Sequence, residues 1–381
     1  MSNHPHRKKL LIITGETSGD HHGALVLRAL SRLDPNLRAA GIGGEELAQA
    51  GMKILYHSRN IAVVGLLEVL AHAPQVLKAF SIVKNEIRTS PPDLILLIDY
   101  PDFNLRIAQF AHKRGVPVMY YISPQIWAWR QGRAKKIARI VDRMAVIFPF
   151  EVPFYEKVGM DVHFVGHPLM DRQEHHVSRT NALNFFGLRD ARPIIGLLPG
   201  SRQGEINRLF IPMLNAAAII KQHVPEAQFV VPLAPGLNKS HIKQLAEAVN
   251  TPVKIVPNSF HQALAACDLA LVVSGTATLE TAIAEKPMVI IYKVAPLTYQ
   301  IGRRLIKVDT IGLANIVAGK KVVPELIQDA ASPENIAREA LGLLNNPERM
   351  TAMQKDLTVV KKALGDGGAS ERVAQLAHEM L

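Results

Sequence analysis

Short apolar runs recur along this chain, and each is followed by a turn and then by a helical pattern. Residues 94–98 (LILLI) and 194–198 (IIGLL) contain no polar side chain. Strands that form such continuous apolar runs are typical of parallel sheets buried on both faces. The repeated strand–turn–helix order therefore predicts an α/β protein with doubly wound parallel sheets.

The pattern occurs in two successive series, which predicts two Rossmann-like domains facing a cleft. The first series has strands near 10–13, 37–56 (two short strands), 94–98, 116–122, 144–148 and 162–165. The second has strands near 194–198, 228–233, 253–256, 269–273 and 288–292. Residues 171–192 are polar without a clear period, and we interpret them as the crossover. We therefore expect an N-terminal domain over 1–170, a C-terminal domain over 171–345, and helices over 346–381 that pack back on the N-terminal domain.

Composition narrows the class of protein. Among 381 residues, 48% are hydrophobic and 20% charged, which is typical of a globular chain. The formal net charge of +11 favours an anionic partner: a nucleic acid, a phosphorylated substrate or an acidic membrane surface. The single cysteine, Cys267, excludes an internal disulfide. The apolar run at 10–13 is too short for a signal sequence or a membrane span, so we expect a cytoplasmic protein that can touch a membrane from outside.

The loop at 199–202, after the strand at 194–198, is a candidate anion site. In open α/β sheets, ligands bind beyond the carboxyl ends of the strands. A helix is expected to begin near Gln203, so backbone N–H groups and the positive end of its dipole would point at one spot. Ser201 lies in this loop, and Arg202 adds a planar donor suited to phosphate oxygens. The alternative is an ordinary strand–helix junction with a surface arginine.

Residues 272–280 (VVSGTATLE) form a second strand–glycine–helix unit. Ser274, Gly275 and Thr276 would line another anion site. Glu280 could accept hydrogen bonds from a ribose diol, or it could simply complement the helix dipole.

Asp99 follows a buried strand and is the candidate general base, because a partly desolvated carboxylate there is suited to proton transfer. Asp102 instead fits a helix N-cap. Glu16 and Asp20, in the turn after the first strand, are candidates for polar substrate contacts, with capping as the alternative for Asp20.

Three other sequence features give weaker indications of function. The histidine pairs at 21–22 and 175–176 do not have chelating geometry on a helix, and no metal motif occurs, so no metal is expected. The basic run 130–143 lacks a nucleic-acid motif and favours a solvated face or attraction to anionic lipid. The apolar helical pattern at 61–87 is typical of a core helix, with exposure at a membrane as the alternative.

Taken in order, five motifs resemble the lipid-A-disaccharide synthase family. They are residues 15–20 (GETSGD), 98–104 (IDYPDFN), 123–130 (SPQIWAWR), 197–202 (LLPGSR) and 274–280 (SGTATLE). The resemblance covers residues 10 to about 320 at the family's spacing. Small departures are Tyr100, where a smaller residue is usual, and Gln125, where serine is frequent. Neither removes a group with an assigned role.

The resemblance implies an inverting glycosyltransferase of the GT-B fold that needs no cofactor. It would transfer 2,3-diacylglucosamine from UDP-2,3-diacylglucosamine to the 6-hydroxyl of 2,3-diacylglucosamine 1-phosphate (lipid X). The products would be the β-1,6-linked disaccharide 1-phosphate and UDP. This step belongs to lipid A synthesis, a branch of lipopolysaccharide synthesis, at the cytoplasmic face of the inner membrane of Gram-negative bacteria. Peripheral, salt-sensitive membrane association would involve residues around 63–82 and 130–143.

The resemblance also implies roles for individual residues. Asp99 and Arg202 would be catalytic, with Asp99 as the base and Arg202 on the leaving diphosphate. The UDP moiety would contact Ser201, Arg202, Ser274, Gly275, Thr276, Glu280 and Asn315. The acceptor would contact Glu16, Thr17, Ser18 and Asn104.

Other readings stay open at this point. The nearest is another UDP-sugar enzyme of the same fold, an epimerase or a different transferase. A nucleotide-binding regulator and a nucleic-acid-binding protein are more distant alternatives. A homodimer that exchanges its C-terminal helices is also compatible with the sequence.

Overall fold

The computed structural model describes residues 7–61, 73–171, 177–296, 298–300 and 310–381. The chain divides into two compact units, which are described separately. Unit 1 comprises Met1–Arg172 together with Leu364–Leu381, and unit 2 comprises Gln173–Ala363.

Unit 1 is built on a seven-stranded sheet in the order β3-β2-β1-β4-β5-β6-β7, and every pair is parallel. The strands are β1 (Lys9–Thr14), β2 (Arg38–Gly43), β3 (Lys53–His57), β4 (Leu94–Ile98), β5 (Val118–Tyr121), β6 (Arg143–Val146) and β7 (Asp161–Phe164). All five residues of β4 are completely buried, as the apolar run predicts for a central strand with both faces covered.

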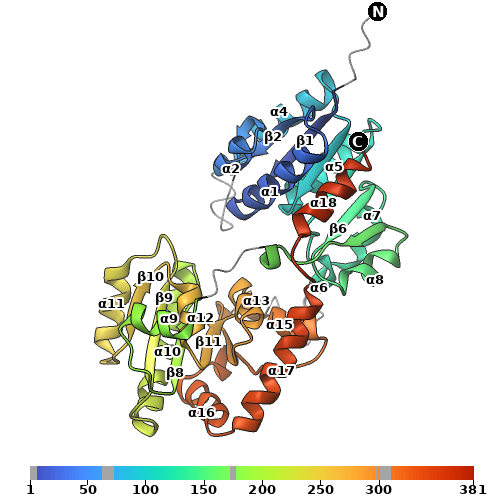
Figure 1. The fold of residues 1–381 in the computed structure, drawn as a ribbon. Coiled ribbons are helices and arrows are strands. Elements are labelled where there is room, and N and C mark those ends of the chain that lie inside the picture. The colour runs from blue at the N-terminus through green and yellow to red at the C-terminus, as the bar shows by residue number, and fades with distance from the viewer. Residues whose placement is uncertain (1–6, 62–72, 172–176, 297, 301–309) are drawn as a thin grey trace, which may run out of the picture. The chain divides into compact units, whose positions relative to one another are not determined.

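Helices connect these strands, as Figure 1 shows in blue to green. They are α1 (Thr17–Leu33), α2 (Glu45–Gln49), α4 (Ala73–Thr89), α5 (Pro101–His112), α6 (Ile126–Trp129), α7 (Ala134–Ile137) and α8 (Glu151–Glu156), with short 3-10 turns η1 (Ser58–Asn60), η2 (Gln131–Arg133) and η3 (Pro168–Asp171). Most of the predicted helix at 61–87 is α4, but residues 62–72 lie outside the described residues. Within the basic run 130–143, the helical residues form two short pieces, η2 and α7.

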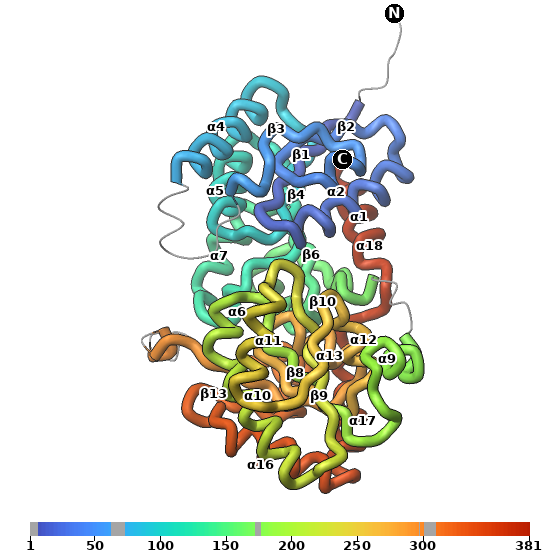
Figure 2. Tube along the Cα trace, turned by 90° about the vertical axis from the view of Figure 1, so that its left-hand side faces the viewer, coloured from blue at the N-terminus to red at the C-terminus, as the bar shows by residue number. Residues whose placement is uncertain are grey.

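The last helix of the chain, α18 (Ala369–His378), packs against α1 of unit 1, and both views show the red helix beside the blue one (Figure 1 and Figure 2). Asp171 caps its N-terminus by accepting hydrogen bonds from the backbone N–H groups of Gly368, Ala369 and Ser370 at 2.8–3.0 Å. Arg372 donates to the carbonyl of Val165 at 2.8 Å. These bonds attach the end of the chain to the end of the first strand series.

Unit 2 holds a six-stranded parallel sheet in the order β10-β9-β8-β11-β12-β13. The strands are β8 (Ile194–Leu198), β9 (Gln228–Leu233), β10 (Lys254–Pro257), β11 (Leu269–Val273), β12 (Met288–Tyr292) and β13 (Glu325–Ile327). Its helices are α9 (Arg179–Phe186), α10 (Gln203–His223), α11 (Lys239–Ala248), α12 (Phe260–Ala266), α13 (Thr276–Ile283), α15 (Leu313–Ala318), α16 (Pro333–Leu344) and α17 (Pro347–Ala363), with the 3-10 turn η4 (Gln328–Ala330).

Two parallel-sheet α/β domains confirm the predicted fold class. Strand β13 has no counterpart in the predicted series. Residues 346–381 are predicted to pack together on the N-terminal domain, whereas the structure separates them at Leu364. Helix α17 packs on α13, α15 and α16 of unit 2, and it buries Met353, Leu357 and Val360 in the core of that unit. Only α18 joins unit 1, because Asp171 and Arg372 hold it there.

Candidate functional site

The carboxyl edge of the unit 1 sheet gathers the loops that follow β1, β4 and β5. Thr14 of β1 pairs with Ile98 of β4, and Ile98 pairs with Tyr121 of β5. The loops that begin after these residues therefore start side by side. These loops carry Glu16, Asp99 and Ser123. The three residues therefore lie at the edge of the sheet where open α/β proteins bind ligands.

Asp99 is partly buried at this edge and adopts a left-handed backbone conformation with φ 47°, as does Tyr100 with φ 48°. Non-glycine residues seldom adopt this conformation, and strained backbone of this kind is concentrated at functional sites. Burial and, secondarily, the neighbouring Glu16 carboxylate raise the pKa of Asp99, although the backbone N–H of Tyr100 opposes the rise. A carboxyl with a raised pKa is a stronger base once it is ionised.

Gly15 makes room for this loop. A Cβ at position 15 would lie 2.1 Å from the ring of Tyr100, so only glycine allows that ring to pack over the first turn. The Tyr100 hydroxyl donates to the carbonyl of Ile61 at 2.8 Å. The unusual Tyr100 is thus accommodated by a glycine of the neighbouring motif.

The predicted acceptor contacts differ in exposure. Glu16, Thr17 and Ser18 are exposed at the start of α1 and are available to a ligand. Asp20, by contrast, is buried and accepts hydrogen bonds from the backbone N–H groups of Gly44 at 2.5 Å and Glu46 at 3.0 Å. Its role is to cap α2, whose own N-cap residue, Gly44, has no side chain to do so.

Asn104 and Asp102 do not have the roles predicted for them. Asn104 is fully buried, and its amide donates to the carbonyls of Asp99 at 2.7 Å and Ile98 at 3.2 Å, so it supports the loop rather than facing an acceptor. Helix α5 begins at Pro101 with Tyr100 as its N-cap, so Asp102 lies inside the first turn and is not the cap.

Glu151 is a buried carboxyl at the same edge that sequence reasoning missed. It accepts hydrogen bonds from Ser123 Oγ at 2.5 Å and from the backbone N–H of Phe148 at 3.0 Å. Burial raises its pKa to about 7, against the opposing effect of these bonds. Its position shortly after β6 is the signal, because the carboxyl-edge rule applies to that strand as well.

In unit 2, the loop between β8 and α10 has the predicted geometry, but it already holds a carboxylate. Glu205 Oε2 accepts hydrogen bonds from the backbone N–H groups of Ser201 at 3.1 Å and Arg202 at 3.2 Å. Gly200 has φ 96°, and a Cβ there would lie 2.2 Å from Glu205 Oε2. Glycine is therefore required both for the turn and for the approach of Glu205.

The Arg202 side chain is 72% exposed, and its Nη1 lies 3.6 Å from Glu205 Oε1. The Glu205 carboxylate also acts on Tyr292, at the end of β12. The pKa of the Tyr292 hydroxyl is raised mainly by burial and secondly by the charge of Glu205. A guanidinium, a carboxylate and two loop N–H groups therefore lie together at this edge. An incoming anion would compete with Glu205 for the N–H groups and would pair with Arg202.

The loop after β11 lies next to this one, because Leu198 of β8 pairs with Val272 of β11. Gly275 and Thr276 are exposed at the N-terminus of α13, and Ser274 Oγ donates to the carbonyl of Ile311 at 3.3 Å. Glu280 lies half-buried farther along α13. The structure thus brings five of the predicted donor contacts to one edge: Ser201, Arg202, Ser274, Gly275 and Thr276.

Asn315 does not reach this edge as a free amide. It is fully buried, and its Nδ2 donates to Glu325 Oε1 at 2.7 Å and to the carbonyl of Val323 at 2.9 Å. Its Oδ1 accepts from the backbone N–H groups of Val322 and Val323. Every polar atom of the side chain is engaged in holding the 322–325 segment, so this geometry gives Asn315 a structural role instead of the predicted diphosphate contact.

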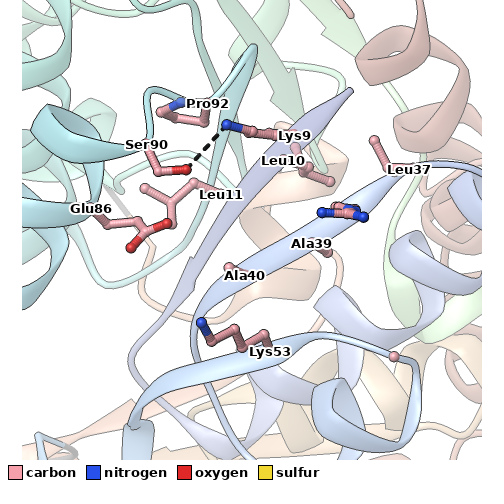
Figure 3. Close-up of a pocket in the computed structure, with 12 residues that line it drawn as sticks. Lys9, Leu10, Leu11, Leu37, Ala39, Ala40, Lys53, Glu86, Ser90 and Pro92 are labelled. Atoms are coloured by element: carbon pink, nitrogen blue, oxygen red, sulfur yellow. Dashed lines mark hydrogen bonds between the residues drawn. The ribbon is translucent and has the colours of Figure 1, made fainter. Parts of the chain in front are cut away.

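A pocket of about 370 Å³ opens at the opposite, amino edge of the unit 1 sheet. Figure 3 shows Lys9 and Lys53 beside it and the 3.2 Å hydrogen bond from Lys9 Nζ to Ser90 Oγ. The pocket lies at the starts of β1, β2 and β3, so it is separate from the loops described above. Across the residues with described positions, no group of three histidine, cysteine or acidic side chains is arranged to hold a metal ion.

Comparison of the sequence with known proteins identifies close relatives. The family model described as lipid-A-disaccharide synthetase matches residues 10–380. The lipid-A-disaccharide synthase of Geobacter metallireducens is 51% identical over 374 residues, which cover 98% of this chain and 97% of the relative. That of Coxiella burnetii (strain Dugway 5J108-111) is 42% identical and covers 98% and 99%.

Solved structures with the same fold are more distant in sequence. The UDP-GlcNAc 2-epimerase of Neisseria meningitidis, bound to UDP-GlcNAc, superposes with a TM-score of 0.67 at 14% identity and covers 97% of this chain and 100% of its own. The glycotransferase of kitacinnamycin gives 0.65 at 14% identity, with 99% and 100% covered. At this identity the likeness establishes the fold alone. The relatives and the family model, which span nearly the whole chain, decide the family: this chain belongs to the lipid-A-disaccharide synthetases, which are glycosyltransferases.

Proposed function

We propose that this chain transfers 2,3-diacylglucosamine from UDP-2,3-diacylglucosamine to the 6-hydroxyl of 2,3-diacylglucosamine 1-phosphate, with inversion at the anomeric carbon. The acceptor oxygen forms a bond to C1 of the donor sugar while the bond from C1 to the diphosphate breaks. UDP leaves with the bonding electron pair, and the acceptor proton passes to a carboxylate. The observation that carries the proposal is Asp99, a partly buried carboxyl with a raised pKa at the carboxyl edge of unit 1.

Unit 1 would bind the acceptor and supply the base. Asp99 takes the proton of the attacking hydroxyl, and exposed Glu16, Thr17 and Ser18 offer hydrogen bonds to the sugar. Glu16 has a second effect, because its charge adds to burial in raising the pKa of Asp99. A base that accepts a proton more readily lowers the barrier to attack.

Unit 2 would bind the donor and stabilise the leaving group. Arg202 pairs with the diphosphate as negative charge develops on it, aided by Ser201 and by the N-terminus of α13 at Gly275 and Thr276. Ser274 would line the same site, and Glu280 is proposed to hold the ribose. We assign no ligand contact to Asn315.

Both substrates carry acyl chains, and we propose that the protein meets them at the cytoplasmic face of the inner membrane. Trp129 is 40% exposed, and the Arg130 guanidinium lies 3.9 Å from the centre of its ring. Exposed basic residues lie nearby: Arg133 on η2, Lys135 and Lys136 on α7, and Arg139 just after α7. Aromatic and basic side chains together suit an anionic bilayer surface. No helix within the described ranges combines the length and apolar character of a membrane span.

Residues around 63–82 are the second proposed membrane contact. Residues 62–72 lie outside the described residues, but Leu77 on α4 is 67% exposed. Binding to anionic vesicles should weaken as salt rises, since screening reduces attraction to the lipid charge. Trp129→Ala should lower binding at every salt concentration. Binding that is unchanged between low and high salt would contradict the electrostatic part of the proposal.

A homodimer that exchanges α18 is the remaining proposal about partners. In one chain, α18 packs on α1 and is capped by Asp171. The same contacts could form between two copies, and light scattering of the purified protein distinguishes one chain from two.

The deciding experiment is a mass-detected transfer assay with both lipid substrates, run on the wild type, Asp99→Ala and Arg202→Ala. The proposal predicts disaccharide 1-phosphate from the wild type and severe loss in both variants. An epimerase of the same fold would convert the UDP-sugar without the lipid acceptor. Because an epimer keeps its UDP and has the mass of the substrate, the absence of both disaccharide and acceptor-dependent UDP release would reject the transfer reaction.

A further inference from the structure

The carbonyl group of Asp99 is held by two buried side chains, Tyr120 on β5 and Asn104 on α5. Tyr120 Oη donates a hydrogen bond to this oxygen at 2.6 Å, and Asn104 Nδ2 donates another at 2.7 Å. Asp99 also donates its own backbone N–H to the carbonyl of Tyr121 at 3.0 Å, which continues the pairing of β4 with β5. The backbone N–H and the carbonyl group of Asp99 are therefore both held by hydrogen bonds.

This arrangement has a cost that packing alone does not explain. Asp99 and Tyr100 are consecutive left-handed residues, a conformation that persists only where surrounding contacts enforce it. Asn104 is completely buried, and its Oδ1 has no hydrogen-bond partner among the described residues. A buried acceptor without a partner is unfavourable, so this amide is kept for what its Nδ2 does. That group donates to the carbonyls of Asp99 and Ile98, and the Asn104 side chain also hydrogen-bonds with the Tyr120 hydroxyl.

We infer that Tyr120 and Asn104 are positioning residues for Asp99: by holding its carbonyl oxygen they fix the backbone that aims its carboxylate. The inference rests on the proposed function, in which Asp99 is the base. If either bond is lost, the 99–100 peptide can relax toward right-handed conformations, and the carboxylate moves with it. Misplacement of a reacting group by about 1 Å costs roughly a hundredfold in rate.

The carboxyl group of Asp99 lies among other titratable groups, and these set the pH dependence. Glu16 faces it from the β1–α1 loop, and Tyr120 faces it from β5. Tyr100 and Asp102 lie on its own loop and on α5, and Tyr155 on α8 lies beyond Tyr120. The Tyr120 hydroxyl bonds to the backbone carbonyl of Asp99 and not to its carboxyl group. Burial is the main cause of the raised pKa of Asp99, so a carboxylate that loses its position and moves toward solvent should shift the acidic limb of the rate profile to lower pH.

The next residue provides a matched control. Tyr120 and Tyr121 are neighbours on β5, and both are 0% exposed. The hydroxyl of Tyr121 has no hydrogen-bond partner within the described part of the chain. Tyr120→Phe and Tyr121→Phe therefore remove the same atom from the same strand, and only the first removes a bond to Asp99.

The test measures kcat, both KM values, the pH profile of kcat and the melting temperature for the wild type and these two variants. We expect Tyr120→Phe to lower kcat roughly tenfold to hundredfold, to leave the donor KM unchanged and to lower the pH of the acidic limb. Tyr121→Phe should retain the wild-type kcat and limb. Equal kcat and equal limbs for the two variants would overturn the inference.

Asn104→Leu is the second variant, because it removes the donor and the unpaired Oδ1 together at similar volume. If the Asn104 amide only stabilises the fold, kcat should fall only when the melting temperature falls. The positioning role predicts a lower kcat even where the melting temperature is retained. Retained kcat in folded Asn104→Leu would count against the inference.

Asp99→Ala separates this inference from the proposed function. In that background Tyr120→Phe should have no further effect on kcat, because there is no carboxylate left to aim. Full turnover by Asp99→Ala would instead reject Asp99 as the base. Inactive Asp99→Ala combined with fully active Tyr120→Phe would reject only the positioning role.

Discussion

The two units have similar sheets, but they treat the charged groups at their carboxyl edges in opposite ways. Unit 1 buries its carboxyls: Asp99 is partly buried and Glu151 completely so, and burial raises both pKa values. Unit 2 keeps its cation exposed: Arg202 is 72% exposed, while Glu205, 25% exposed, covers the loop N–H groups beside it. Burial therefore shifts the pKa values of carboxyl groups in unit 1, whereas the edge of unit 2 is characterised by the pairing of Arg202 with Glu205.

This difference matches the two tasks of a glycosyl transfer. A proton acceptor benefits from a site that shifts its pKa toward the working pH. A diphosphate site needs permanent positive charge and N–H donors that a ligand can reach. In the proposed reaction, proton transfer belongs to the unit 1 edge and leaving-group binding to the unit 2 edge, and each proposed role can be tested alone.

Asp99→Asn should have the largest effect. It keeps the size of the side chain but removes the base, and we expect kcat to fall about 10²- to 10⁴-fold with little change in donor KM. Steady-state kinetics of the transfer reaction measure this. The control is Asp102→Asn, an exposed carboxylate three residues along, which should have nearly wild-type kinetics. Equal losses in both variants would mean that the burial of Asp99 is irrelevant.

Arg202→Ala should come next, with a loss of roughly 10²- to 10³-fold in kcat/KM for the donor, because it removes charge from the leaving group. Arg208→Ala is the matched control: this arginine is exposed on the same helix and donates to the carbonyl of Gly204. The affinity for UDP, measured by calorimetry, should fall for Arg202→Ala alone. Unchanged UDP affinity would place the diphosphate elsewhere.

Glu151→Gln should change how stability depends on pH. The pKa of Glu151 rises from 4.5 when unfolded to about 7 in the folded chain, so the native state binds the extra proton between these values. Wild-type stability should therefore fall as pH rises through this window and stay lower above it, by about 3 kcal/mol at most.

The glutamine variant lacks this dependence, because its amide stays neutral. Urea unfolding at pH 5.5 and pH 8 measures the difference, and Glu156→Gln, exposed on the same helix, is the control. A wild type and a Glu151→Gln protein with parallel pH dependence would refute a raised pKa at Glu151.

Glu205→Gln should have the smallest effect. The carboxylate lies where the proposed diphosphate must approach, and even with the screening of bulk water a like charge at 4 Å costs about 1 kcal/mol. UDP should therefore bind roughly fivefold tighter to the variant. Glu247→Gln, exposed on α11, should leave UDP affinity unchanged. Weaker binding by Glu205→Gln would mean that this carboxylate builds the site instead of opposing it.

Much of the fold could be predicted from the sequence, because buried parallel strands leave an unmistakable pattern. Strands β4, β8, β9, β11 and β12 begin and end where the apolar runs do. The short strand β13 (ELI) has no such run, and its three residues are only partly buried. Nothing in residues 346–381 indicated that α17 and α18 belong to different units, because hydrogen bonds from residues far along the chain decide it.

The candidate site was less predictable than the fold. Asp99 and Arg202 lie at the carboxyl edges of their sheets, where the carboxyl-edge rule predicts ligand-binding loops. It could not tell which polar side chains on those loops face inward. Asn104 and Asn315 are fully buried and bond to nearby carbonyls and N–H groups, which a motif does not reveal. Glu205 was visible in its motif, but its occupation of the loop N–H groups depends on side-chain conformation.

The placement of α18 has a consequence for how this protein is made. Unit 1 takes its first residues and its last ones, so unit 2 is an insertion within it. A ribosome delivers all of unit 2 before it delivers the helix that completes unit 1. The surface of α1 that α18 covers therefore stays uncovered by its native neighbour until synthesis ends. A nonsense mutation shortly before residue 369 would damage the domain that was translated first and leave the later one whole.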